Sequence, residues 1–299
     1  MLSTYSLYRR NYLNQWKVVD LLINVVATIS LFYVLLTLLA NANLIVDLAY
    51  LIKIYPEHGV VRVAFLFNEP LLMGLNFVIF LTLAEWRERR KWVSGALILG
   101  VLSTLSLSSY VLLFVYLFIK NIRLNLTSLK TYFVLATFVL LIIGMTIVLK
   151  DRINNILLLE DGSTRIRLAL TISSFMMFLD NWATGVGWGN SGEKLSEYGN
   201  IFSSSVNMEL SYSSNLYLSI LSELGILGII PFCIFIYFII KSSKSDRGLM
   251  SGCLVVLLSF FQQALLLYPA VWFFWVVILT KNLKLNHVSK KHLSFKLKT

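Results

Sequence analysis

Charged residues are scarce in this sequence, and their scarcity argues against a soluble protein. Only 14% of the 299 residues are charged, whereas 58% are hydrophobic. A soluble domain is usually about one quarter charged, so this chain has too few polar residues to cover a soluble surface. The apolar residues also form long runs, which indicates several membrane spans. We therefore expect an all-α polytopic integral membrane protein.

Cysteine and histidine are rare as well. The two cysteines, Cys233 and Cys253, lie inside apolar runs, and the chain has three histidines. This pattern excludes a disulfide scaffold and a thiolate metal site. No group of His, Cys, Asp and Glu has the spacing of metal ligands. We predict that the protein uses no metal and no other cofactor.

Acidic residues are outnumbered by basic ones, 15 to 26, and the formal net charge is +11. A basic chain can indicate nucleic-acid binding, but here the basic residues gather between the apolar runs. If both termini are cytoplasmic, these clusters all face the cytoplasm, as the positive-inside rule requires. We therefore predict no nucleic-acid partner. The clusters are Arg9, Arg10 and Lys17; Arg87, Arg89, Arg90 and Lys91; Lys120, Arg123 and Lys130; Lys241, Lys244 and Arg247; and Lys281, Lys284, Lys290, Lys291, Lys296 and Lys298.

The apolar runs predict about eight transmembrane helices. Several runs are shorter than the roughly 20 residues that a helix needs to cross the hydrocarbon core. We divide 92–119 and 248–285 into hairpins, since a single helix over 92–119 would place its flanking basic clusters on opposite sides. The predicted spans are roughly 18–40, 70–84, 92–107, 109–119, 131–149, 216–240, 248–267 and 269–285.

These spans form one predicted transmembrane domain over residues 1–299. Residues 1–17 and the basic tail 281–299 are cytoplasmic, and 41–69 and 150–215 are outer loops. A loop as long as 150–215 is usually functional or disordered, and its aromatic content argues against disorder. Its apolar run Leu168–Leu179 is too short to span and predicts a re-entrant or interfacial helix.

The stretch "GVGWGNSG" (185–192) contains Gly187-x-Gly189-x-x-Gly192, the glycine spacing of a dinucleotide-binding turn. That motif requires a preceding strand and a βαβ unit, whereas a short helix is predicted before this one. Two structural roles stay open for the glycines. They can form a tight turn where helices pack closely, or they can let the backbone approach an extracytoplasmic ligand.

Three arginines and one glutamate in the outer loops are the main candidates for chemistry. Arg62, Arg165 and Arg167 could bind phosphate in bidentate fashion, although interfacial arginines are often snorkelling anchors. Glu69 precedes Pro70 at the start of a span, where it could act as a base or simply favour a helix N-terminus.

Other carboxylates are weaker candidates. Glu223 lies in a predicted span, where an acid is functional by default unless it bonds to neighbouring helices. Asp180 and Glu209 lie in the large outer loop.

Four segments resemble those of the bacterial O-antigen ligase and polysaccharide-polymerase family, in the family's order and over roughly residues 60–240. In the family an Arg opens a short helix, and a glycine turn follows at the spacing of Arg167 and Gly185. The ligases typically have a histidine immediately before an asparagine. Here Ser214 occupies that position, before Asn215, and the absence of the histidine favours a polymerase. The family usually has more spans than predicted here. The segments are "VRVAFLFNEP" (61–70), "LSTLSLSSY" (102–110), "GSTRIRLALTISSFMMFLDNWATGVGWGN" (162–190) and "SSNLYLSILSELGILGIIPF" (213–232).

The resemblance implies a metal-independent membrane glycosyltransferase. It would join repeat units from undecaprenyl-pyrophosphate-linked donors at the outer face of the bacterial cytoplasmic membrane, for O-antigen, capsule or exopolysaccharide. Its cations would stabilise the pyrophosphate leaving group, and Glu69 would take the acceptor proton. The implied pyrophosphate ligands are Arg62, Arg165 and Arg167, and the implied turn glycines are Gly185, Gly187 and Gly189.

The partners that the resemblance implies are the lipid-linked oligosaccharide, the lipid bilayer, and a chain-length regulator and flippase of the same pathway. Three alternatives stay open. The protein could be a flippase or transporter of the same lipid, a ligase that transfers sugar to lipid A, or a truncated inactive relative. A flippase should carry ionisable residues throughout its bundle, whereas most charges here lie outside the spans.

Overall fold

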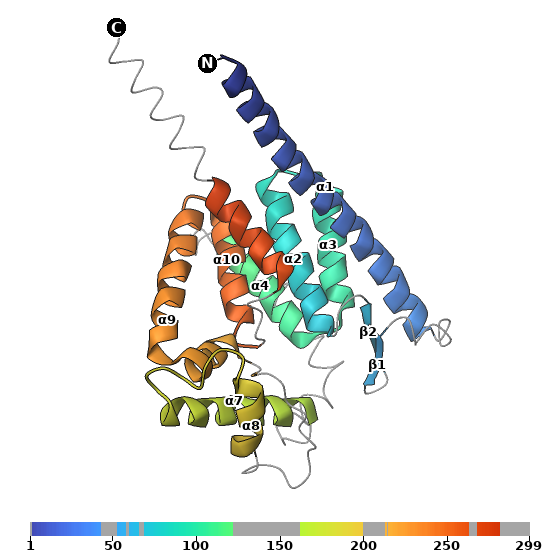
Figure 1. Ribbon diagram of the computed structural model, residues 1–299. Helices are drawn as coiled ribbons and strands as arrows, with labels where there is room; N and C mark the ends of the chain where they lie inside the picture. The colour runs from blue at the N-terminus through green and yellow to red at the C-terminus, as the bar shows by residue number, and fades with distance from the viewer. Residues whose placement is uncertain are drawn as a thin grey trace, which may run out of the picture. The chain divides into compact units, whose positions relative to one another are not determined.

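The computed structural model describes residues 2–42, 53–57, 60–65, 69–121, 162–199, 213, 215–262 and 268–281. The chain divides into two compact units, each described by itself below. The first unit is Met1–Asn121 with Arg247–Val255, and the second is Ile122–Asp246 with Val256–Thr299. Helices dominate both units (Figure 1).

The described helices α1 to α4 lie in the first unit together with the first part of α10 (Arg247–Ser259), and α3 packs against both α1 and α2. Gly100 of α3 permits this packing, because a Cβ there would lie 2.8 Å from Ser30 and 2.9 Å from Phe77. The predicted division of 92–119 into two helices is confirmed, since a turn containing Leu105 (φ 49°) separates α3 from α4. The helices are α1 (Leu2–Asn41), α2 (Pro70–Trp86), α3 (Lys91–Ser103) and α4 (Leu107–Asn121).

The first unit also contains an antiparallel hairpin of β1 (Lys53–Glu57) and β2 (Val60–Phe65). It lies in the predicted outer loop 41–69, so the all-α prediction is wrong for this segment. Its β-branched and aromatic side chains favour extended structure. The two strands were not predicted because they are short and their alternation is a weaker signal than the long apolar runs of the spans. The hydroxyl of Tyr33 on α1 donates a hydrogen bond to the carbonyl of Val63, which attaches the hairpin to α1.

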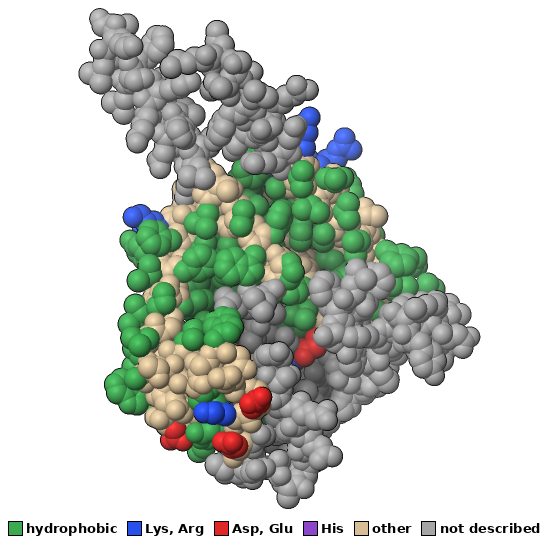
Figure 2. All heavy atoms as spheres, viewed as in Figure 1, with side chains coloured by type: hydrophobic (Ala, Val, Ile, Leu, Met, Phe, Trp, Pro, Cys, Tyr) green, Lys and Arg blue, Asp and Glu red, His purple; other side chains and the backbone are tan. Residues whose placement is uncertain are grey.

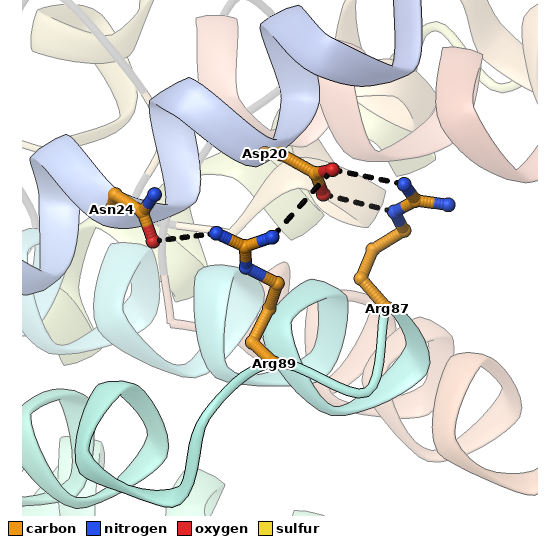
Figure 3. A network of polar contacts seen from close by, with 4 residues as sticks. All are labelled: Asp20, Asn24, Arg87 and Arg89. Carbon is orange, nitrogen blue, oxygen red and sulfur yellow. Dashed lines mark hydrogen bonds and ion pairs between the residues drawn. The ribbon is translucent and has the colours of Figure 1, made fainter. Parts of the chain in front are cut away.

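An ionic network joins α1 to the turn between α2 and α3 (Figure 3). Arg87 donates two hydrogen bonds to the carboxylate of Asp20, at 3.0 and 2.9 Å. Arg89 lies 3.6 Å from the same carboxylate and donates to Asn24 at 3.1 Å. Two members of a predicted cytoplasmic cluster therefore also bind a neighbouring helix.

The second unit contains a crosswise helix, α7, that packs against α8 and α9 (Figure 1). The predicted helix 168–179 begins too late, because α7 starts at Gly162, and the polar residues Ser163, Thr164 and Arg165 hid its first turns. α8 has no apolar run and was not predicted. The helices are α7 (Gly162–Asp180), α8 (Ser191–Gly199), α9 (Leu216–Ser243), the helix Pro269–Lys281, and α10 (Arg247–Ser259), which enters this unit from the first.

Two described helices are long and apolar enough to cross a membrane, Trp16–Asn41 and Leu216–Ser243. Hydrophobic side chains cover much of the coloured surface in Figure 2. A mainly helical fold with two candidate membrane spans is therefore confirmed, whereas the count of eight spans and the cytoplasmic termini stay predictions. The predicted span 131–149 lies outside the described residues. Five shorter apolar helices are Pro70–Trp86, Lys91–Ser103, Leu107–Asn121, Arg247–Ser259 and Pro269–Lys281.

Candidate functional site: a glycine turn against a broken helix

The glycine turn, residues 181–190, connects α7 to α8. Gly185, Gly187 and Gly189 have φ values of 67°, 98° and 80°. This left-handed region costs a residue with a Cβ atom about 1–2 kcal/mol, whereas glycine adopts it freely. The turn follows a helix rather than a strand, so it lacks the context of a dinucleotide-binding motif.

α9 is broken at Gly225, where φ is 63° and ψ is −160°. In a continuous helix the amides of Ile226 and Leu227 would donate to the carbonyls of Ser222 and Glu223. The break leaves these two donors and two acceptors without their helical partners. Backbone groups buried in this way need other hydrogen bonds.

The backbone of the glycine turn supplies all four missing partners. The turn donates two amides to the half of α9 before the break and accepts two amides from the half after it. Backbone hydrogen bonds between the glycine turn and α9 therefore replace the helical bonds that are lost at Gly225. The bonds run from Val186 to Ser222 (2.9 Å), from Gly187 to Glu223 (2.8 Å), from Ile226 to Trp182 (2.9 Å) and from Leu227 to Ala183 (3.3 Å).

Two glycines permit this close approach. A Cβ on Gly185 would lie 2.2 Å from the carbonyl carbon of Glu223, and one on Gly225 would lie 2.3 Å from the carbonyl oxygen of Ala183. In both cases the obstacle is backbone, which cannot move aside as a flexible side chain could. Close packing is therefore the role of Gly185, and Gly225 is a partner that the sequence did not single out.

Glu223 adds a side-chain link to the same junction. It is only 8% exposed, and its carboxylate accepts hydrogen bonds from the amide of Gly189 (3.1 Å) and the hydroxyl of Ser191. Ser191 begins α8, and a negative charge is favourable near a helix N-terminus. Glu223, a weaker candidate by sequence, thus connects α9 to the glycine turn and to α8.

The helix that carries Arg167 is fixed to this junction. Arg167 is half-buried in the second turn of α7, and Leu170 and Met177 of α7 form a buried cluster with Leu195 of α8. α7 also packs against α9. The backbone around Arg167 is therefore braced by neighbouring helices, as a preorganised cation requires.

The other main candidates lie in different places. Glu69 is half-buried at the N-cap of α2, where its side chain makes no capping hydrogen bond. Arg62 lies on β2 in the first unit and Arg165 on α7 in the second. The side chains of Arg62 and Arg165 lie outside the described residues.

Two weaker candidates have clear local roles. Asp180 accepts a hydrogen bond from the hydroxyl of Tyr198 at 2.8 Å, and this bond raises the pKa of Tyr198. The Asn215 side chain caps α9 by accepting from the amides of Tyr217 (2.9 Å) and Leu218 (3.3 Å). Glu209 and Ser214 lie outside the described residues.

Comparison with known families places this junction in context. Residues 92–233, just under half of the chain, match the family model described as O-antigen ligase. The matched stretch includes α7, the glycine turn and the break in α9, and it confirms the resemblance predicted from the motifs. No curated protein matches the chain.

Proposed function

Since residues 92–233 match the O-antigen ligase family model, we propose that the protein is a polysaccharide polymerase. It joins oligosaccharide repeat units at the outer face of the bacterial cytoplasmic membrane. Its donors are linked to undecaprenyl pyrophosphate, and its product is an O-antigen, capsule or exopolysaccharide chain.

The observation that carries this proposal is the bracing of α7 inside the family-matched region. Arg167 lies on α7, which packs on α8 and α9. The glycine turn that follows α7 is hydrogen-bonded to α9 through its backbone and through the side chain of Glu223. A cation held in this way can stabilise charge that develops during a reaction without first reorganising.

In the proposed reaction, the oxygen of an acceptor hydroxyl attacks the anomeric carbon of the donor sugar. A new glycosidic bond forms while the bond between that carbon and the pyrophosphate oxygen breaks. Arg167, supported by Arg62 and Arg165, stabilises the negative charge left on the lipid pyrophosphate. Glu69 accepts the proton of the attacking hydroxyl.

Two features favour polymerisation over the alternatives. Ser214 stands where the ligases typically have a histidine, which disfavours transfer to lipid A. A flippase would need ionisable residues throughout its bundle to pass the charged headgroup, whereas most charges in this chain flank the spans.

Deleting the gene tests the proposal through the length of the surface polysaccharide. We expect long chains to collapse to single repeat units that still reach the surface, and full-length protein supplied from a plasmid should restore them. Loss of even single units would instead indicate a flippase. Long chains that accumulate without attachment to lipid A would indicate a ligase. Chains of normal length that are still attached to lipid A would contradict both the polymerase and the ligase.

A further inference from the structure

α7 carries apolar side chains on two opposite faces, and in the part of the chain that the structure describes one of these faces is exposed. Leu168, Phe175 and Leu179 are 44%, 47% and 54% exposed. At 3.6 residues per turn these positions share one face. The opposite face carries the buried Leu170 and Met177. A helix that is hydrophobic all round is normally buried or surrounded by lipid, so the exposed face needs an apolar partner.

Two exposed tryptophans follow the end of α7 in the chain. Trp182 and Trp188 of the glycine turn are each 60% exposed. The indole ring is large and apolar but carries one hydrogen-bond donor, which suits it to the boundary between lipid and water. We group these two side chains with the exposed face of α7 under one name, the platform: Leu168, Phe175, Leu179, Trp182 and Trp188.

The glycine turn, which carries both tryptophans, is hydrogen-bonded to a helix whose exposed face suits lipid. After the break, four apolar residues of α9 have the spacing of a single helix face. They are Ile226, Leu227, Ile230 and Ile234, and each side chain is between 41% and 65% exposed. This segment belongs to a helix apolar enough to cross a membrane. Its first two residues are hydrogen-bonded to the backbone of the glycine turn at Trp182 and Ala183, so the platform begins where the lipid-suited face of α9 begins.

Helix length locates the membrane boundary at the same point. All 28 residues of α9 would extend about 42 Å at 1.5 Å per residue, well beyond the roughly 30 Å of hydrocarbon. The part after the break, 226–243, is about 27 Å long and fits that thickness. Lys241 and Lys244 lie at the far end of this segment. The positive-inside rule assigns both to the cytoplasm.

We propose that the platform docks into the outer boundary of the lipid bilayer, and that α9 enters the hydrocarbon at Gly225 rather than at Leu216. The aliphatic face of α7 contacts acyl chains, and the two tryptophans lie at the level of the headgroups. Glu223 then lies at the water-facing side of the boundary instead of inside the membrane. Arg167, next to Leu168, comes to the level of lipid phosphates. This docking is independent of the polymerase proposal, because it concerns lipid contact only.

Fluorescent probes at single cysteines test the docking in the full-length protein. Cys233 and Cys253 are first replaced by alanine, and an environment-sensitive probe is attached at Phe175→Cys, Leu179→Cys or Trp182→Cys. The labelled protein is reconstituted in vesicles of phosphatidylethanolamine and phosphatidylglycerol that contain nitroxide-labelled lipids. Glu193→Cys, on the exposed side of α8, is the matched control.

We expect lipid-borne nitroxides to quench the three platform probes and to leave the probe at position 193 bright. Equal brightness at 179 and 193 would overturn the docking. Polymer synthesis in cells measures the proposed function separately, so an inactive protein with quenched platform probes contradicts the polymerase and supports the platform.

A second pair of probes, at positions 219 and 234, tests where α9 enters the membrane. Neither position belongs to the platform, so the platform side chains stay intact. Headgroup nitroxides should quench a probe at Ser219→Cys more than nitroxides near the bilayer centre do. A probe at Ile234→Cys should show the opposite order. If central nitroxides quench position 219 as strongly as position 234, the whole of α9 is embedded and the boundary at Gly225 is wrong.

Discussion

At the scale of single residues, the carboxylate of Glu223 is buried where two segments of backbone meet. Burying a charge is costly unless hydrogen bonds compensate for the lost water. The amide of Gly189 and the hydroxyl of Ser191 supply that compensation. Neither donor could be inferred from the sequence, because Gly189 and Glu223 are distant in the chain and no motif relates them.

We expect Glu223→Leu to lower the free energy of unfolding by about 1–3 kcal/mol, because it leaves the buried hydroxyl of Ser191 and the amide of Gly189 without their acceptor. Glu223→Gln keeps an acceptor and should be milder. Thermal unfolding of the purified protein in detergent measures the difference. The control is Glu197→Leu on the exposed surface of α8, and an equal loss in the control would refute the role of Glu223.

The glycines of the turn differ in what an added methyl group would meet. Gly185→Ala has both a left-handed φ and a backbone clash, whereas Gly189→Ala has the left-handed φ and open space. We expect Gly189→Ala to cost about 1–2 kcal/mol and Gly185→Ala to cost considerably more. Melting temperatures of the two variants provide the comparison. Gly95→Ala, where φ is not positive and no atom lies within 4 Å of the new methyl, should not destabilise, and similar losses at 185 and 189 would contradict the clash.

Arg167 carries the main functional prediction at this scale. Removing a group that stabilises charge in a transition state typically costs about 100-fold or more in rate. We expect Arg167→Ala to shorten the surface polysaccharide to a few repeat units, and Arg167→Lys to restore it only in part, because lysine lacks the bidentate geometry. Chain length on a gel is the readout. Lys194→Ala, at an exposed cation on α8, should leave chain length normal. Normal chains in both Arg167 variants would disprove the pyrophosphate role.

At the scale of elements, hydropathy located the helices well and failed where polar backbone contacts decide the structure. The apolar runs at 70–84 and 216–240 correspond closely to α2 and α9. The break at Gly225 was missed because its helical hydrogen bonds are replaced by bonds from the glycine turn, which lies more than thirty residues earlier in the chain. Such long-range replacement leaves no periodic signal in the sequence.

The ionic network in Figure 3 joins two elements of the fold, α1 and the turn between α2 and α3. Asp20 and Arg87 are 24% and 30% exposed, so solvent weakens their attraction. We expect a double-mutant cycle of Asp20→Ala and Arg87→Ala to give a coupling of about 0.5–1 kcal/mol in the free energy of unfolding. The same cycle between Lys17→Ala and Arg87→Ala serves as the control. A coupling of zero for Asp20 and Arg87 would show that the network does not hold α1.

At the scale of the whole molecule, composition and charge predicted a helical membrane protein. Three of the four family-like segments lie within residues 92–233, the stretch that matches the O-antigen ligase family model. The catalytic site is a different matter, because its two main candidates belong to separate units. Arg167 lies in the second unit and Glu69 in the first. Their pairing in one reaction therefore stays a prediction from the resemblance. Chain length in Glu69→Gln tests it, since full-length chains in that variant would show that Glu69 is not the base.

The orientation of the chain gives the last prediction. α9 separates α8, with its exposed Glu193, from the turn that contains Ser245. If α9 crosses the membrane once with its basic end inside, Glu193→Cys faces outward and Ser245→Cys faces the cytoplasm. In intact cells lacking Cys233 and Cys253, we expect a membrane-impermeant maleimide to label position 193 at once and position 245 only after permeabilisation. Labelling of both positions in intact cells would mean that α9 does not span. Labelling of position 245 alone would invert the topology and move the glycine turn, Arg167 and the platform to the cytoplasmic face, which is incompatible with polymerisation at the outer face.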